Sequence, residues 1–159
     1  MNRLTAFPIK QIGLISTFFF ICSLALFSEE PEKVKVNVLV ILGSKSDKEI
    51  CPKLKLLAAE IQKKDSSLTG FKLSKTICES IEMGKCKELE LVDNKVMKIC
   101  VNKQLNEDGK MILTIHPPTL GQITYSCKCE KYFPIITTYK TKSDQQQILI
   151  LAIMAKKCN

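Results

Sequence analysis

Two apolar runs near opposite ends of the chain constrain its fold more than any other feature. The first, residues 34–42 (VKVNVLVIL), starts with alternation and becomes fully apolar, and the second, residues 148–153 (ILILAI), is equally apolar. Short continuous apolar runs bounded by polar turns are typical of strands that are buried on both faces. We therefore expect these two segments to form the centre of a β-sheet.

Only one segment has a clear helical period. Between about residues 52 and 64, the apolar positions Leu54, Leu57, Ala58 and Ile61 fall on one side of a helix, and charged residues fall on the others. Ser46 and Glu49 have capping-box spacing, but a helix that began there would place Pro52 inside its first turns. Proline is favoured at the first helical position, so we expect the helix to begin at Pro52.

The segments after residue 66 read as strands and turns. Alternating stretches occur around residues 71–73, 87–91, 96–101, 111–115 and 123–129, separated by turn signals such as residues 93–95 and 106–109, and residues 132–136 read as the entry to a further strand. Pro134 is compatible with an edge strand or a bulge. One strand, one helix and then six or seven strands predict an α+β fold with a mostly antiparallel sheet or meander and a single packed helix.

The N-terminus has the pattern of a secretory signal peptide. Arg3 and Lys10 precede an apolar run over residues 12–27, Ser28 follows, and Glu29 begins a charged stretch. We therefore expect a signal peptide over residues 1–28, a short linker over 29–33 and one domain over 34–159, located in the periplasm or secreted. The alternative is a membrane anchor through residues 12–27, although this run is shorter than the roughly 20 residues that a spanning helix needs.

Lysine dominates the charge of the chain. Of 24 basic residues, the leader contains Arg3 and Lys10, which leaves 22 lysines against 16 acidic residues and a net charge of about +6. Arginine is the usual residue for bidentate contacts to guanine or phosphate, and the chain beyond the leader has none. The sequence therefore argues against specific nucleic-acid recognition, and a membrane contact is expected only if the leader is retained.

Seven of the eight cysteines lie beyond the leader. They are Cys51, Cys78, Cys86, Cys100, Cys127, Cys129 and Cys158. In an oxidising compartment some of them should form disulfides, and an odd number leaves at least one thiol free or bonded between molecules. If Cys127 and Cys129 share one strand, they face the same side about 6.5–7 Å apart, too far for easy bridging. Their positions suggest core-facing cysteines or cross-strand disulfides.

Other chemistry has weak support in the sequence. No CxxC motif occurs and the chain has one histidine, so we expect neither a metal site nor another cofactor. His116 follows an alternating strand and should lie on its solvent face. Glu88 and Glu90 share a strand face beside Leu89, which is the expected solvent face. We therefore expect no catalytic residues.

One short segment resembles a phosphate-binding motif. Residues 38–47, which end in Gly43, Ser44, Lys45, Ser46 and Asp47, resemble the opening motif of the phosphoribosylaminoimidazole carboxylase family of purine biosynthesis. That resemblance implies an anionic-ligand loop that binds phosphate through backbone amides and hydroxyls at a helix N-terminus. It covers ten residues, and the family's later active-site segments have no counterpart here. We therefore treat this loop as a weak candidate site and expect a plain turn between strand and helix.

A broader resemblance covers roughly residues 34–154. The opening strand that ends at Val40-Ile41-Leu42-Gly43-Ser44, the Pro52-Lys53-Leu54 step and the closing run 148–153 are similar to an uncharacterised family of small secreted bacterial proteins. This chain has more cysteines and lysines than that family's pattern. The resemblance implies a fold and a location outside the cytoplasm, but no activity.

These observations favour a non-enzymatic binding or accessory protein of the cell envelope, which contacts another envelope protein. The alternative is a thiol-based redox or metal-handling protein that uses the cysteines.

Overall fold

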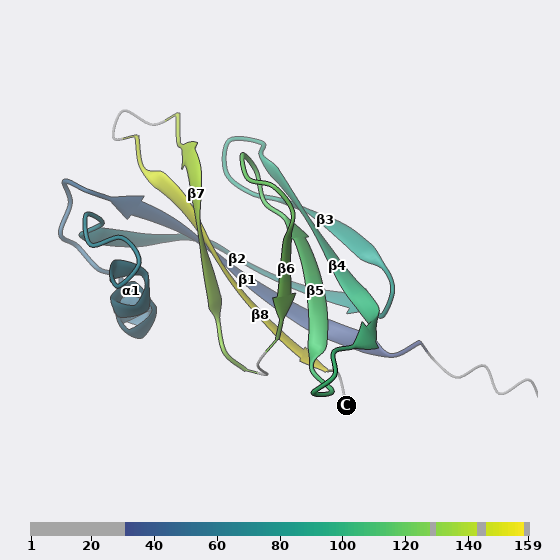
Figure 1. Cartoon of the computed structure of the whole chain (residues 1–159). Coiled ribbons are helices and arrows are strands. Elements are labelled where there is room, and N and C mark those ends of the chain that lie inside the picture. The colour runs from purple at the N-terminus through teal and green to yellow at the C-terminus, as the bar shows by residue number, and fades with distance from the viewer. Residues whose placement is uncertain (1–30, 128–129, 143–145, 158–159) are drawn as a thin grey trace, which may run out of the picture.

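The computed structural model describes residues 31–127, 130–142 and 146–157, which form eight strands and one short helical segment (Figure 1). The strands are β1 (Lys33–Ser44), β2 (Gly70–Glu82), β3 (Cys86–Glu90), β4 (Val96–Leu105), β5 (Met111–His116), β6 (Ile123–Ser126), β7 (Phe133–Lys140) and β8 (Ile148–Lys157). A 3₁₀ turn, η1 (Pro52–Leu54), leads into the helix α1 (Lys55–Gln62) between β1 and β2.

The strands form two four-stranded antiparallel sheets. Sheet A has the order β2-β1-β8-β7, and sheet B has the order β3-β4-β5-β6. The sequence analysis expected one sheet, and this was wrong. The chain crosses between the sheets after β2 and after β6, because each sheet has an apolar inner face that must be covered by another layer. The mostly antiparallel character and the seven strands after the helix are as predicted.

The two apolar runs form the centre of sheet A, as predicted. β1 and β8 pair with each other over ten positions, from Val34 opposite Lys157 to Gly43 opposite Ile148. β2 and β7 flank them and form the edges of the sheet. Pro134 lies in β7, where an edge position leaves its missing N–H group without consequence for the ladder.

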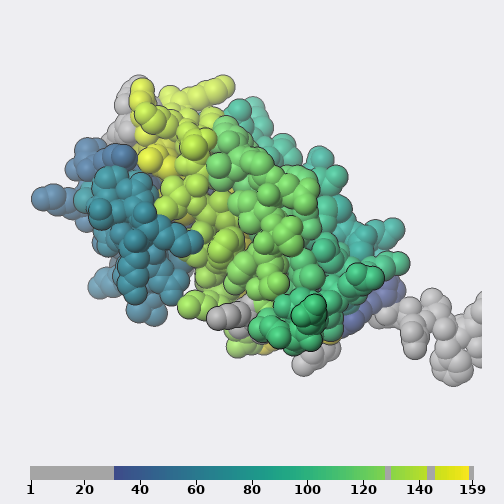
Figure 2. Space-filling model, in the orientation of Figure 1, coloured from purple at the N-terminus to yellow at the C-terminus, as the bar shows by residue number. Residues whose placement is uncertain are grey.

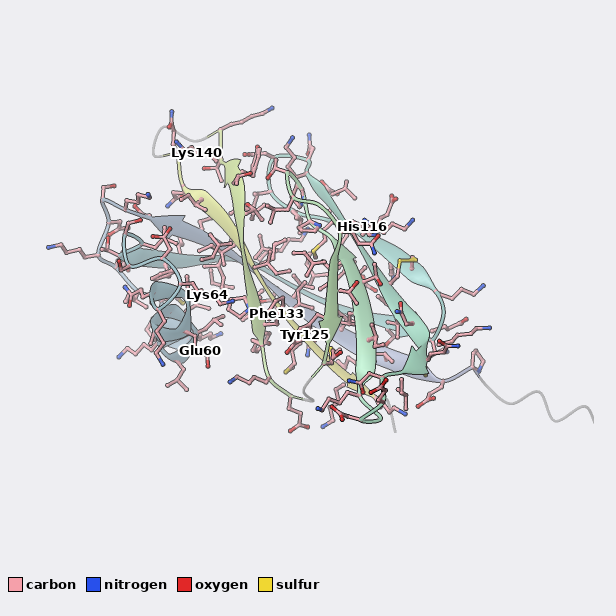
Figure 3. All side chains as sticks on the ribbon, in the orientation of Figure 1. Glu60, Lys64, His116, Tyr125, Phe133 and Lys140 are labelled. Carbon is pink, nitrogen blue, oxygen red and sulfur yellow. A yellow bond between two sulfur atoms is a disulfide. The ribbon has the colours of Figure 1, made fainter. Side chains whose placement is uncertain are left out.

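Aliphatic side chains fill the space between the sheets. Sheet A contributes alternate residues of β1 and β8, and sheet B contributes those of β4 and β5. The residues of these four strands that face the other sheet and are less than 2% exposed are Val34, Val36, Val38, Val40, Leu149, Leu151, Ile153, Ala155, Met97, Ile99, Val101, Leu113 and Ile115. On the face shown in Figure 2, the side chains of the yellow-green strands meet those of the green strands and cover the interior. Tyr125 of β6 stacks on Phe133 of β7 with the ring centroids 4.1 Å apart, which joins the two sheets along one edge (Figure 3).

The helix covers one end of the outer face of sheet A. The four residues that the sequence placed on its apolar side, Leu54, Leu57, Ala58 and Ile61, are all buried there, against Ile41, Phe71, Ile150 and Ala152. The helix is shorter than the predicted span of 52–64. Pro52 begins a 3₁₀ turn rather than an α-helical turn, and the α-helical part ends at Gln62.

Two other predictions concern the ends of the chain. The signal peptide over residues 1–28 and the first part of the 29–33 linker lie outside the described residues, and Lys33 already belongs to β1. In the part of the chain that the structure describes, no helix is sufficiently long and apolar to cross a membrane.

Candidate functional site

The loop after β1 is a polar segment that is held by hydrogen bonds to its own side chains. β1 runs through Ser44, so Gly43 and Ser44 belong to the strand and not to the loop in which the sequence analysis placed them. The buried Ser44 hydroxyl accepts hydrogen bonds from the backbone N–H of Asp47 (3.0 Å) and of Ser46 (3.3 Å). Asp47 Oδ1 in turn accepts from the N–H of Glu49 (3.0 Å). The loop therefore uses its own side chains to satisfy its amides.

The segment before β2 fixes this loop in place. The backbone N–H of Thr69 donates to Ser44 O (2.8 Å), and its hydroxyl donates to Asp47 O (2.6 Å). Gly70 lies so close to the loop that a Cβ atom there would be 2.8 Å from Asp47 O. Glycine is therefore required at this position for the loop and β2 to approach each other.

This geometry differs from that of a phosphate loop at a helix N-terminus. In the described chain, residues 48–51 separate the loop from the helix, and Ile50 forms an isolated parallel bridge with Phe71 of β2. The N–H groups of Ser46 and Asp47 point to the Ser44 hydroxyl, so they are occupied. The backbone cradle that the resemblance implies is not formed here.

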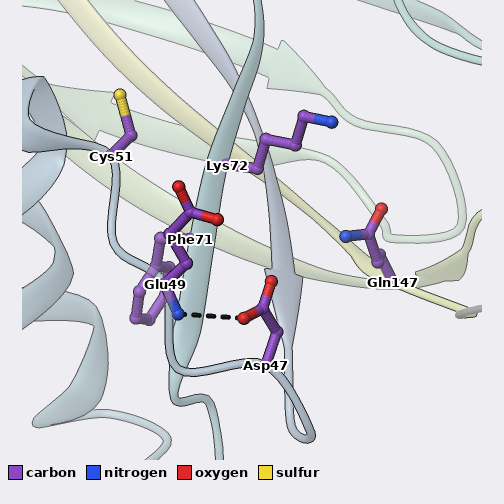
Figure 4. A pocket seen from close by; sticks show the side chains of 6 residues that line it. All are labelled: Asp47, Glu49, Cys51, Phe71, Lys72 and Gln147. Atoms are coloured by element: carbon purple, nitrogen blue, oxygen red, sulfur yellow. Dashed lines mark hydrogen bonds between the residues drawn. The ribbon is translucent and has the colours of Figure 1, made fainter.

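Two hollows with opposite charge lie on either side of the loop. The first, with a volume of about 380 Å³, is lined by Asp47, Glu49, Cys51, Phe71, Lys72 and Gln147 (Figure 4). The second, of about 390 Å³, is lined by Gly43, Lys45, Ser46, Lys140, Gln146 and Ile148. The loop thus presents carboxylates to one hollow and a lysine with a hydroxyl to the other.

Asp65 is an acidic residue close enough to Lys45 for their charges to interact. It accepts hydrogen bonds from the hydroxyl (2.6 Å) and the backbone N–H (3.0 Å) of Ser67. These bonds lower the pKa of Asp65, and the positive charge of Lys45 lowers that pKa further. Asp65 is therefore ionised at neutral pH and partly offsets the charge of Lys45.

The structure brings two of the seven candidate cysteines together. Cys86 of β3 and Cys100 of β4 are directly opposite each other in the ladder and form a disulfide on the exposed outer face of sheet B. The sequence analysis could not assign this pairing. The hairpin turn at residues 93–95 was the signal that could have found it, because it brings β3 and β4 together in antiparallel register.

The other three described cysteines have separate environments. Cys51 is half-buried and Cys78 is exposed, and both have free thiols. Cys127 is 3% exposed and packs in the core between the sheets. It follows β6 instead of lying within it, which corrects the prediction of one strand through Cys127 and Cys129. Cys129 and Cys158 lie outside the described residues.

Cys78 lies close to an aromatic side chain on the outer face of sheet A. Burial raises the pKa of Tyr132, and the proximity of Cys78 raises it further.

Among the residues that the structure describes, no three His, Cys, Asp or Glu side chains lie together in a way that could hold a metal ion.

The other candidate side chains lie on the outer face of sheet B. Glu88 and Glu90 are exposed there, and Leu89 between them is buried, as the alternation predicts. His116 is half-buried at the end of β5, opposite Lys98 of β4. It lies far in the fold from the loop after β1, at the position labelled in Figure 3.

No protein-family model, curated protein or solved structure matches the chain.

Proposed function

We propose that this protein is an exported binding or accessory domain of the cell envelope, periplasmic or secreted, which acts by contacting another envelope protein and not by catalysis. The Cys86–Cys100 disulfide carries this proposal. Disulfides persist in oxidising compartments, and the N-terminal leader pattern independently points to the same location. The similarity to small secreted bacterial proteins supports it as well.

The polar groups of the described residues also favour a structural and binding role. The hydroxyls of Ser44 and Thr69 hold the loop after β1. Asp93 accepts hydrogen bonds that join the two sheets. Two of the cysteines are already bonded to each other. These hydroxyls, this carboxylate and these two sulfur atoms are thus engaged in maintaining the fold.

The intact mass of the protein, taken from the cells that produce it and alkylated without reduction, tests this proposal. We expect a mass that lacks residues 1–28 and in which Cys51 and Cys78 are alkylated but Cys86 and Cys100 are not. Trypsin should release peptide 86–87 linked to peptide 99–103, since lysines border both segments. A Cys86→Ser variant, which cannot form this link, is the control.

Two results would contradict the proposal. The first is an intact chain in the cytosol whose thiols all react. The second is a processed protein with four or more reactive thiols that include Cys86 and Cys100, and this result would favour the thiol-based alternative.

A further inference from the structure

We propose that the basic hollow beside the loop after β1 binds an oxyanion: a phosphate or sulfate group, either free or carried by a larger molecule. The hollow lies on sheet A at the end where β1 stops, and its lining consists of Gly43, Lys45, Ser46, Lys140, Gln146 and Ile148. This inference concerns the ligand of one site and does not depend on where the protein is located.

The sheet itself brings the two lysines to one place. Ile148 of β8 is opposite Gly43 on one side and opposite Lys140 of β7 on the other. Gly43, Ile148 and Lys140 therefore form one row across three hydrogen-bonded strands. Lys45 follows Gly43 by two residues, at the point where the chain leaves β1, and Lys140 ends β7, as labelled in Figure 3.

Gly43 keeps this row closely packed. A Cβ atom at Gly43 would lie 2.7 Å from Ile150 Cδ1 and 3.3 Å from Leu68 Cδ2. The backbone beneath the hollow is thus fixed against the buried cluster under the helix. With a backbone fixed in this way, only the lysine side chains have to be ordered when a ligand binds.

The charges of the two lysines are not balanced by ion pairs. Neither Lys45 nor Lys140 forms a salt bridge with another described residue, whereas Lys87, Lys110, Lys131, Lys156 and Lys157 each do. The lining of the hollow includes no carboxylate. Two ammonium groups that share one hollow repel each other, and an anion between them removes this repulsion.

Neutral hydrogen-bond donors complete the site. Ser46 contributes a hydroxyl and Gln146 contributes an amide to the same lining. Because the N–H groups of Ser46 and Asp47 are occupied by Ser44, the side chains and not the backbone would hold the anion. Lysine is an effective point charge for phosphate, and it does not need the bidentate geometry of arginine.

Asp65 provides a second test of whether charge determines how tightly the hollow binds an anion. Its carboxylate interacts with Lys45 and competes with an incoming anion. An Asp65→Asn substitution keeps the oxygen that accepts hydrogen bonds from Ser67 but removes the charge. This variant should therefore bind the oxyanion more tightly than the unsubstituted protein does.

A titration of the purified chain with inorganic phosphate, followed by amide NMR shifts at constant ionic strength, tests the proposal. We expect saturable shifts at Lys45, Ser46, Lys140 and Gln146. The double variant Lys45→Gln/Lys140→Gln should weaken binding at least tenfold, and Asp65→Asn should strengthen it severalfold. Constant ionic strength separates binding from general screening of surface charge.

The matched control is Lys55→Gln/Lys98→Gln, which removes the same charge from two exposed lysines elsewhere. Its phosphate affinity should equal that of the unsubstituted protein. Shifts that do not saturate, or an equal loss of affinity in both double variants, would overturn the proposal.

Sedimentation with vesicles distinguishes the two sources of the oxyanion. Capture on phosphatidylglycerol vesicles, but not on phosphatidylcholine vesicles, that disappears in Lys45→Gln/Lys140→Gln would support a lipid headgroup. Phosphate binding without vesicle capture would support a soluble ligand. Failure of both assays would contradict the site itself.

Discussion

Asp93, in the turn between β3 and β4, connects the two sheets through a single carboxylate oxygen. Its Oδ2 accepts hydrogen bonds from the Tyr139 hydroxyl (2.9 Å) and the Lys142 backbone N–H (2.9 Å). The bond from Lys142 and then the bond from Tyr139 lower the pKa of Asp93. Asp93 and Asn94 both have positive φ (53° and 59°), a conformation that Asp and Asn tolerate better than most residues.

The lowered pKa predicts how stability depends on pH. Because the folded pKa lies below the ordinary Asp value of 3.8, the contribution of Asp93 is present above that value and is lost as the pH falls through the folded pKa. We expect Asp93→Ala to lower the melting temperature at pH 7 but to have a much smaller effect at a pH low enough to protonate this carboxylate. Melting curves across this range check the prediction, and an equal effect at both pH values would contradict it.

The Thr137 side chain forms hydrogen bonds at the point where the regular pairing of β7 with β8 is interrupted. Between Ile136 and Lys140 the register of β7 shifts, and the buried Thr137 hydroxyl donates to Leu149 O (2.7 Å) and accepts from the Tyr139 N–H (3.2 Å). Thr137→Val keeps the shape but leaves these groups without their partner. We expect a loss of about 1–3 kcal/mol in the free energy of unfolding, measured with urea.

The neighbouring Thr138 provides the control for this prediction. It is exposed and bonds to Thr119 at the surface (3.0 Å between the hydroxyls). Thr138→Val should change the free energy of unfolding by less than about 0.5 kcal/mol. Similar losses in the two variants would mean that the burial of the Thr137 hydroxyl does not determine the effect on stability.

At the scale of elements, α1 stabilises sheet A through one side only. Ile61 is fully buried beneath it, whereas Leu56 is 89% exposed on the same helix. We expect Ile61→Ala to cost about 2–5 kcal/mol in the free energy of unfolding, and Leu56→Ala to change it by less than about 0.5 kcal/mol. Urea unfolding of both variants checks this, and comparable effects would contradict the observed packing.

The Cys86–Cys100 disulfide cross-links the two strands of the β3–β4 hairpin. It joins residues 14 positions apart, and a closed loop of about this length restricts the unfolded chain by about 3 kcal/mol. We expect Cys86→Ser/Cys100→Ser to destabilise the protein by about 2–4 kcal/mol. The difference should disappear when both proteins are unfolded under reducing conditions, and a difference that persists would indicate another cause.

The helix and the central strands could be predicted because their patterns are strong. The four apolar positions of 54–61 and the runs 34–42 and 148–153 identify buried surfaces directly. Most of β2 could not be predicted beyond Leu73, because it is an edge strand in which residues 74–80 are largely exposed and lack regular alternation. Edge strands need fewer apolar residues, so the sequence signal is weak.

In the candidate site, the local feature could be predicted from the sequence, but the contact between distant segments could not. The polar loop after the first strand was recognisable from residues 43–47. The second lysine of the basic hollow, Lys140, comes from a strand almost a hundred residues later, and only the pairing of β7 with β8 brings it there. The division into two sheets was also non-local, because it depends on which strands pair: β3 to β6 form one sheet, and β7 returns to pair with β8 in the other.

At the scale of the whole molecule, the fold is closed by its first and last strands. β8 lies between β1 and β7 and carries six of the most buried residues of the core, Leu149, Ile150, Leu151, Ala152, Ile153 and Ala155. A chain that ends at residue 147 should therefore not fold. Loss of the β-sheet signal in circular dichroism and loss of dispersion in amide NMR would confirm this prediction, and a folded truncated chain would contradict it.

The pairing of β1 with β8 also places Glu32 and Lys157 side by side, where they form an ion pair of 2.7 Å. The helix lies at the other end of β1, whose 12 residues span roughly 36 Å at about 3.3 Å per residue (Figure 1). The residues that line the two hollows lie at that end as well. A group attached next to Glu32 or Lys157 is consequently held at one pole of the domain. A fluorescent label or a surface tether attached there leaves the opposite pole accessible, so the protein can be immobilised for binding measurements by either end.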